Sequence, residues 1–333
     1  MSVPISVLDL APIARGATAS ESIAASAALA QHAEEHGYTR VWYAEHHNMP
    51  SIASSATSLL IAHVGAQTSS IRLGAGGVML PNHSPLVIAE QFGTLEAMYP
   101  GRIDLGLGRA PGSDQNTMYA LRRDPTSADR FPEDVLELQA YLAGTSRVPG
   151  VDAVPGKGSN VPLYILGSSL FGAHLAAALG PPYAFASHFA PQMLEAAVGT
   201  YRREFTASAQ LDAPYVIAGI NVIAADTEAD AQEQLLMSRR LRAAGIFGQR
   251  GHEYTDEEAD LLLEHGAAVH VDQMLTYSAI GTPREVREAV ERFAKHADAD
   301  ELIVAHQSPT PAARLRSVEL LAEAMAPAPA DPR

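Results

Sequence analysis

Short apolar stretches alternate with longer amphipathic stretches along almost the whole chain. Eight of the apolar stretches have the length of buried strands, at residues 5–10, 41–44, 71–75, 103–107, 163–166, 183–186, 215–223 and 301–305. Helix-like periodicity fills the segments around them, at residues 21–37, 54–67, 85–98, 130–143, 170–179, 191–208, 227–244, 283–296 and 311–325. Repeated strand–helix units predict a parallel sheet with helical crossovers, and eight of them predict an α/β fold closed into a (β/α)8 TIM barrel.

Two segments interrupt this alternation. Residues 144–161 are rich in glycine and proline, which predicts a loop. Residues 245–280 separate the seventh strand and its helix from the next helix start, and they predict a lid-like insertion of partly helical character. We therefore expect a single domain over residues 1–326, followed by a disordered tail at residues 327–333.

The composition narrows the class of protein. Hydrophobic residues make up 47% of the 333 residues and charged residues 18%, which is enough apolar material for a large core. The formal net charge of −15, without a lysine/arginine cluster, argues against nucleic acid and anionic membranes as partners. The chain has no cysteine, which excludes thiol nucleophiles and thiolate metal sites. The amino terminus lacks a basic signal-peptide start, and the longest uncharged stretch is too polar to span a bilayer, so we expect a cytoplasmic protein.

The tripeptide Glu45-His46-His47 follows directly after the apolar strand at residues 41–44. Ionisable side chains at the carboxyl end of a barrel strand are typical of an active site. Successive strand residues point to opposite faces, so if Trp42 faces the barrel interior, His46 does too, while Glu45 and His47 point away. This makes His46 the candidate catalytic residue, and His47 more typical of a structural histidine.

Small residues gather after the third and fourth strands. The run Gly74-Ala75-Gly76-Gly77 leaves the barrel mouth without bulky side chains, as expected where a flat group approaches the backbone, although a tight turn or bulge is also possible. The run Gly106-Leu107-Gly108-Arg109 adds a bare face and a fixed positive charge. It resembles a dinucleotide fingerprint only superficially, because Pro111 and a missing third glycine spoil the spacing.

The segment from Leu166 to Gly172 follows the fifth strand and leads into a helix. Its small residues and hydroxyls at a helix amino terminus can bind a phosphate, although a serine is also an ordinary helix cap. Together with Arg109 at the neighbouring strand end, the segment predicts one anion site built from two loops.

Asp9 and His188 are the candidate substrate contacts, at the ends of the first and sixth strands. For His188 a surface loop is an equal alternative. A metal-dependent barrel hydrolase that uses Asp9, His46 and His188 is a further alternative, although strand alternation argues against His46 and His47 sharing one metal. We expect no bound metal.

Taken together, these motifs resemble the bacterial luciferase-like flavin monooxygenase family over nearly the whole chain. The similarity is densest at residues 44–47, 74–81 and 90–109, and extends to residues 280–283 and 314–317. It implies a barrel that binds FMN at its mouth, with a cis peptide between Gly76 and Gly77 beneath the flavin ring.

The resemblance also implies roles for individual residues. His46 matches the histidine that luciferases use as an acid/base, and Arg109 matches a residue that contacts the flavin phosphate. The implied cofactor-binding positions are Ala75, Gly76, Gly77, Gly108, Arg109, Gly167, Ser168, Ser169 and Gly172. Two positions depart from luciferase. Gly108 stands where luciferase has a cysteine, which puts light emission and long-chain aldehyde specificity in doubt, and Ser168 stands where it has an acidic residue.

The implied activity is that of a two-component monooxygenase. A separate NAD(P)H:flavin reductase supplies reduced FMN, which reacts with dioxygen to a C4a-hydroperoxide that oxygenates a small molecule. Some relatives act on aromatic polyketides, so a secondary metabolite is a plausible substrate. Family members are commonly homodimers, through helices after the second and third strands. The alternatives are an F420-dependent oxidoreductase and a non-catalytic flavin-binding relative.

Overall fold

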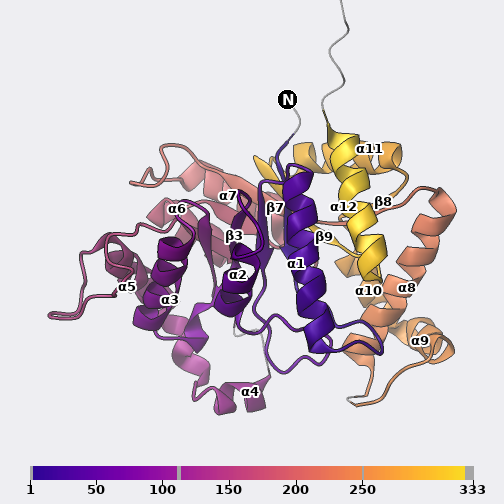
Figure 1. The fold of residues 1–333 in the computed structure, drawn as a ribbon, viewed down its shortest axis with the longest axis horizontal. Coiled ribbons are helices and arrows are strands. Elements are labelled where there is room, and N and C mark those ends of the chain that lie inside the picture. Colours follow the sequence, from indigo (N-terminus) through magenta and orange to yellow (C-terminus); the bar gives the residue numbers. More distant parts are fainter. Residues whose placement is uncertain (1–2, 111–113, 250, 327–333) are drawn as a thin grey trace, which may run out of the picture.

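Eight parallel strands close into a barrel in this computed structural model, which describes residues 3–110, 114–249 and 251–326 (Figure 1). The strands of the described part are β1 Ile5–Asp9, β2 Arg40–Tyr43, β3 Arg72–Met79, β4 Ile103–Gly108, β5 Leu163–Gly167, β6 Tyr183–Phe185, β7 Val216–Ala224, β8 Ser278–Gly281 and β9 Glu301–His306. β1 to β7 pair with one another in chain order, and β9 closes the ring between β7 and β1. β8 lies outside the ring and, among the described strands, pairs with β7 alone. The predicted TIM barrel is confirmed, and each of the eight predicted strands is present.

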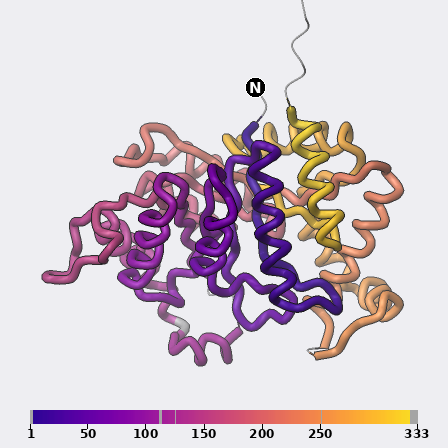
Figure 2. The backbone as a smooth tube through the Cα atoms, viewed as in Figure 1, coloured from indigo at the N-terminus to yellow at the C-terminus, as the bar shows by residue number. Residues whose placement is uncertain are grey.

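Helices surround this ring. They are α1 Ala19–Glu35, α2 Thr57–Gly65, α3 Pro85–Met98, α4 Gln115–Ala120, α5 Phe131–Ala143, α6 Leu170–Leu179, α7 Leu194–Glu204, α8 Glu228–Phe247, α9 Asp256–Leu262, α10 Ala268–Met274, α11 Pro283–His296 and α12 Pro311–Met325. The backbone tube shows the first helix, α1, beside the last, α12, so the first and last strand–helix units lie side by side where the barrel closes (Figure 2). No helix in the described ranges is long and apolar enough to cross a bilayer.

The sequence also fixes where helices begin. Thr18 precedes α1, where its hydroxyl accepts a hydrogen bond from the Glu21 N–H at 3.2 Å and the Glu21 carboxylate accepts one from the Thr18 N–H at 2.8 Å. Thr282 and Glu285 make the same reciprocal pair at the start of α11. Each pair satisfies amide groups that the first helical turn leaves without partners.

A ninth strand, β8, was not predicted from the sequence. It pairs with residues 221–224 of β7, on the edge that β6 leaves free beyond residue 218. Because β8 contains only one large apolar residue, Ile280, its sequence lacks a strand signal. Since α8 continues to Phe247 and β8 begins at Ser278, the insertion between them is shorter than the predicted residues 245–280. The predicted tail at residues 327–333 lies outside the described residues.

The insertion lies beside the loop that follows β1. It contains α9, α10 and a π-helical turn at Leu263–Ala267, which pack on α8. The Arg15 guanidinium donates to the Tyr254 carbonyl and lies 3.4 Å from the Asp256 carboxylate. The loop after β1 leaves the carboxyl end of the barrel, so these contacts place the insertion near the barrel mouth (Figure 1).

Paired charges fill the opposite end of the barrel, where the strands begin. The Arg40 Nε lies 2.8 Å from Glu301 Oε1, and its Nη1 lies 2.7 Å from Asp104 Oδ2. Burial alone would lower the pKa of Arg40, but Asp104 and Glu301 raise it above its ordinary value. Tyr164 and Tyr215 add hydroxyl groups to the same network. The buried charges at this end of the barrel, which we call the barrel floor, are therefore paired and hydrogen-bonded.

Candidate active site

His46 reaches the carboxyl end of the barrel from β2. Parallel hydrogen bonding continues beyond the strand, from the Ala44 N–H to the Asp9 carbonyl at 3.2 Å and from the Glu45 N–H to the Gly77 carbonyl at 3.3 Å. Side chains therefore keep alternating, and Trp42 and Ala44 belong to the cluster inside the barrel. His46 shares their face, as predicted from the sequence.

The imidazole of His46 is largely buried and has a free ring nitrogen within the described part of the chain. Its Nδ1 is buried and has no hydrogen-bond partner among the described residues. Burial lowers the pKa of His46, and a backbone interaction with Ala44 and the charge of Glu45 offset part of this shift. The ring is therefore mostly neutral near pH 7, with a nitrogen available to a bound molecule.

Glu45 points away from the interior and binds two histidines. Its carboxylate lies 2.8 Å from the His47 Nε2 and 2.9 Å from the His83 Nε2, and it accepts the Met79 N–H at 3.0 Å. Burial alone would raise the pKa of Glu45, but these hydrogen bonds hold it below its ordinary value. Glu45 therefore ties the end of β2 to the end of β3, and His47 has the predicted structural environment.

Bare backbone lies beside His46 at the end of β3. The peptide bond between Gly76 and Gly77 is cis. A Cβ on Gly76 would lie 2.8 Å from the Cβ of Trp42, and one on Gly77 would lie 2.7 Å from the Gly106 carbonyl oxygen. Only glycine fits at these positions, and the partly exposed Gly76 presents backbone without a side chain to the mouth.

A cation and a helix amino terminus meet at the ends of β4 and β5. The Arg109 guanidinium carbon lies 4.1 Å from the ring centroid of Phe171, in the first turn of α6. Ser169 precedes α6 but makes no side-chain hydrogen bond to its amide groups. Gly167 and Gly172 approach closely, with a Cβ on either at 3.5 Å from the Cα of the other. The predicted pairing of Arg109 with this loop is therefore present, and its donor set fits a phosphate.

His188 follows β6 and lies in the mouth rather than in a surface loop. Its backbone carbonyl accepts a hydrogen bond from the Asn221 Nδ2 at 2.7 Å, and its Nδ1 is buried without a partner among the described residues. Burial lowers the pKa of His188 to about 3, with smaller contributions from Arg242 and His46. His188 and Arg242 share Asn221 as a hydrogen-bond neighbour, and the charges of Arg242 and His46 both act on the His188 ring.

Asp9, in contrast, does not face the mouth, which corrects the expectation that it contacts substrate. Its carboxylate lies 2.7 Å from the Arg314 Nη2, accepts the Ala11 N–H at 3.0 Å and also accepts the Ser26 hydroxyl. These partners place Asp9 in the layer between the barrel and helices α1 and α12. The strand alternation that turns His46 inward turns Asp9 outward, because Asp9 pairs in register with the outward Tyr43.

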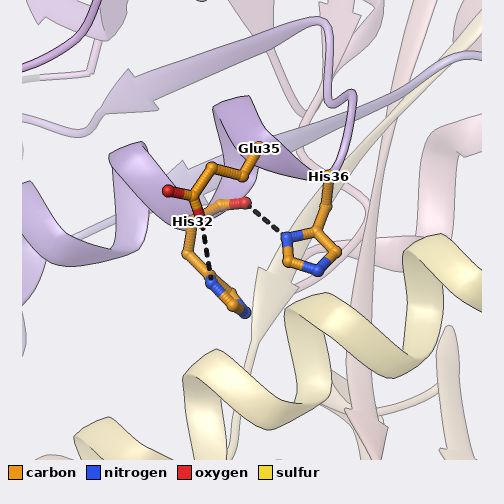
Figure 3. Close-up of side chains that lie close together, drawn as sticks. All are labelled: His32, Glu35 and His36. Atoms are coloured by element: carbon orange, nitrogen blue, oxygen red, sulfur yellow. Dashed lines mark hydrogen bonds and ion pairs between the residues drawn. The ribbon is translucent and has the colours of Figure 1, made fainter.

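The hydrolase alternative requires Asp9, His46 and His188 around one metal, and the described residues do not assemble this set. They bring together two other groups of histidine and glutamate side chains, Glu45/His47/His83 and His32/Glu35/His36. The second group lies in the last turn of α1, where the His36 Nδ1 bonds the His32 carbonyl at 2.8 Å (Figure 3). Since α1 runs antiparallel to the strands, this turn lies at the end of the barrel opposite His46.

Two polar residues of the mouth were missed in the sequence, Asn221 and Arg242. Asn221 lies on the inward face of β7, two and four residues after Gly219 and Ile217, within an otherwise apolar run. Arg242 lies on the stripe of α8 that contains the buried Ala231 and Ser238. An arginine on the buried face of a helix could have indicated that Arg242 is functional. Because α8 has three arginines within four positions, the sequence does not show which of them lies on that face.

Sequence comparison identifies the family. The profile of the luciferase-like monooxygenases matches residues 3–299. The chain belongs to the luciferase-like monooxygenase family. A luciferase-like monooxygenase of Escherichia coli (strain K12) is 48% identical over 96% of both chains. The N-acetyl-S-alkylcysteine monooxygenase of Bacillus subtilis (strain 168) is 34% identical over 87% of this chain and 89% of its own. The expectation of an oxygenating enzyme is thus confirmed at the level of the family.

Structure comparison agrees with this assignment. The crystal structure of apo-MsnO8 superposes with a TM-score of 0.85 at 36% identity, covering 97% of this chain and 98% of the other. Proteins that share the fold at 19% identity or less include an FMN-bound monooxygenase and F420-dependent enzymes. At that distance the likeness shows the fold alone, so the cofactor of this chain must be argued from its own residues.

Proposed function

We propose that this protein is a two-component monooxygenase that takes up reduced FMN and uses it to oxygenate a small organic molecule with dioxygen. One observation carries the proposal. Arg109 stacks on Phe171 at the uncapped amino terminus of α6, next to bare backbone at Gly76. A dianionic phosphate and a flat ring are the two parts of FMN that such an arrangement can hold.

The proposed cofactor contacts divide into two sets. Ala75, Gly76, Gly77 and Gly108 lie at the carboxyl ends of β3 and β4, where the absence of large side chains admits the flavin ring. The other set supplies donors to the phosphate: Arg109, Gly167, Ser168, Ser169 and Gly172. When bound, the reduced flavin supplies the electrons and activates dioxygen.

His46 is the proposed acid/base of the reaction. Its neutral ring can accept a proton from the substrate and return it, because its Nδ1 has no competing partner in the described structure. His188, neutral and buried on the opposite side of the mouth, is the proposed substrate contact. The apolar interior below both rings, formed by Leu8, Trp42 and Tyr164 among others, excludes water from the site.

Other components of the proposed system follow from the cofactor. A separate NAD(P)H:flavin reductase would supply reduced FMN, and the insertion beside Arg15 would close over the mouth as a lid. Exposed apolar residues on α2 and α3, including Leu59 and Met98, suit the predicted homodimer. For the substrate, an aromatic secondary metabolite stays a prediction, and a thioether is suggested by the Bacillus subtilis relative.

The phosphate assignment is tested by comparing FMN with riboflavin. We expect Arg109→Gln to weaken FMN binding by about tenfold or more while leaving riboflavin binding unchanged, because only FMN has the phosphate. Arg130→Gln is the control, since Arg130 is exposed and pairs only weakly with Asp134, at 3.7 Å. Equal weakening of both ligands by Arg109→Gln would refute the assignment.

The cofactor is tested by anaerobic titration with reduced FMN and reduced F420, followed by rapid mixing with oxygenated buffer. Binding of reduced FMN and a transient absorbance distinct from oxidised and reduced FMN support the monooxygenase. F420-dependent hydride transfer is the second candidate function, because enzymes of that class share this fold and F420 also carries a phosphate. Binding of F420 but not of FMN would establish it in place of the first.

A further inference from the structure

Arg242 differs from the other arginines of α8. The neighbouring Arg239 lies 2.9 Å from a carboxylate oxygen of Asp272, and Arg240 lies 2.6 Å from one of Asp260. Arg242 forms no ion pair with any described carboxylate. Among the described residues it makes one hydrogen bond, which is long, 3.3 Å from Nη2 to the Asn221 Oδ1. Its Nε is buried without a partner there, as is that of Arg239, so the missing carboxylate is what distinguishes Arg242.

This guanidinium is directed into the barrel mouth. Asn221, its hydrogen-bond partner, is 1% exposed and lies on the inward face of β7. The Asn221 amide also donates to the His188 carbonyl at 2.7 Å, so Asn221 bridges Arg242 and His188. Arg242 therefore lies beside His188, with Asn221 bonded to both, at the same end of the barrel as His46.

The cation has no compensating charge there. His188 is neutral, and two acidic residues of the insertion, Asp256 and Asp260, are paired with Arg240. Burial lowers the pKa of Arg242, and no carboxylate of the described residues pairs with it to offset that shift. Removing a charge from water without a partner is costly, so such a residue is typical of a site where the ligand supplies the opposite charge.

We propose that Arg242, positioned by Asn221, binds a carboxylate of the substrate, so that the enzyme acts on small organic acids. A guanidinium can donate two parallel hydrogen bonds to a carboxylate, which orients it as well as attracting it. The acid would extend from Arg242 past His188 toward His46. This inference rests on the proposed function for the identity of the site, but the anion site itself requires no flavin.

The same cation could in principle serve the cofactor phosphate, and the topology argues against this. The proposed phosphate donors, Arg109 and the start of α6, follow β4 and β5. Arg242 instead approaches over β7, and β6 separates β5 from β7 in the barrel. Two separate cationic positions at one mouth suit two separate anionic groups, one on the cofactor and one on the substrate.

A panel of acids and their neutral amides tests the proposal on the full-length protein. N-acetylmethionine, S-methyl-N-acetylcysteine, phenylacetate and a series of linear aliphatic acids would each be compared with the corresponding amide by calorimetry, with and without FMN. We expect at least one acid to bind about tenfold or more tightly than its amide. Arg242→Met should abolish this preference, and Arg242→Lys should retain part of it because the charge remains.

Arg239→Met is the matched control, because it removes an arginine from the same helix that already has a carboxylate partner. It should leave the preference for acids unchanged. If Arg242→Met fails to fold, as judged by circular dichroism, Arg242→Lys and Asn221→Ala provide the comparison, the latter weakening acid binding by releasing the guanidinium.

Three outcomes overturn the proposal: no acid in the panel binds more tightly than its amide, the preference survives in Arg242→Met, or Arg242→Met weakens FMN but not riboflavin. The last would assign Arg242 to the phosphate. Acid binding that depends on Arg242 in a protein that binds no flavin would instead refute the proposed function and leave the anion site standing.

Discussion

Both ends of the barrel contain buried charged or polar groups, but those at the floor have hydrogen-bond partners and several at the mouth have none among the described residues. At the floor, Arg40 lies between Glu301 and Asp104 at 2.8 and 2.7 Å, and each of the three side chains is at most 7% exposed. At the mouth, His46 and His188 each keep a buried ring nitrogen without a partner in the described structure, and Arg242 keeps a buried Nε.

This difference separates stability from function. Buried polar groups are nearly always hydrogen-bonded, and each exception costs free energy of folding. The floor shows that this chain can satisfy buried charge with its own side chains. Buried atoms without a partner also occur elsewhere in the described structure, at His32 Nε2 and Tyr43 Oη for example, so it is the gathering of His46, His188 and Arg242 at one end that favours the mouth as the place where a ligand completes the hydrogen bonding.

The largest expected effect is the loss of stability on removing Arg40 from the ion pairs of the barrel floor. Arg40→Met leaves Glu301 and Asp104 buried with much of their compensating charge removed, so we expect the free energy of unfolding to fall by about 3–5 kcal/mol. Urea denaturation at pH 7 measures this. Arg284→Met removes an exposed arginine that pairs with Glu288 at 3.3 Å, and it should change stability by less than about 1 kcal/mol. A similar small change for Arg40→Met would mean that water reaches the floor.

The next largest effect is the loss of activity on replacing His46, which should leave the fold intact. His46→Gln removes the proposed proton acceptor, and we expect product formation from an acid identified with the panel to fall about a hundredfold or more. The FMN affinity and the midpoint of urea unfolding should stay close to those of the wild type, because the buried Nδ1 has no hydrogen bond to lose. A parallel loss of flavin affinity would show that His46 supports the cofactor rather than proton transfer.

The contrast between floor and mouth was only partly visible in the sequence. Periodicity located every barrel strand, because buried parallel strands read as apolar runs, and strand alternation turned His46 inward and Glu45 outward. The buried ion pairs of Arg40 could not be predicted, since its partners Asp104 and Glu301 lie 64 and 261 positions away and no local pattern joins them. Asp9 was misplaced because its partner Arg314 lies 305 positions away.

Glu45 lies at the mouth end but faces outward with its hydrogen bonds made, so it is expected to contribute to stability as the charges of the floor do. Glu45→Gln replaces a carboxylate that binds His47, His83 and the Met79 N–H, and we expect a loss of about 1–3 kcal/mol at pH 7. Because the pKa of Glu45 is lowered from its ordinary 4.5, the carboxylate contributes fully above pH 4.5 and loses its contribution as the pH falls below that value. Urea denaturation between about pH 6 and about pH 3 should therefore show a constant difference above pH 4.5 and convergence of the two proteins below it. A difference that stays constant below pH 4.5 would mean that the loss does not come from the carboxylate charge.

The smallest effect compares two neutral histidines, His188 in the mouth and His306 in the outer layer. Burial lowers the pKa of each from 6.5 to about 3. As the pH falls below 6.5 the unfolded chain takes up a proton at each position and the folded chain does not, so each histidine reduces stability by about 1.4 kcal/mol per pH unit.

Replacing either histidine with glutamine should remove its contribution to the pH dependence of stability, measured by urea denaturation between pH 5 and pH 7. At pH 7 the two variants should differ. His306→Gln disrupts a hydrogen bond of 2.9 Å between its Nδ1 and the Ser317 Oγ and should cost about 1 kcal/mol, whereas His188→Gln removes a nitrogen that has no partner and should cost less. An unchanged slope in His188→Gln would mean that the mouth is hydrated enough for His188 to titrate normally, and that its unpaired nitrogen is satisfied by water.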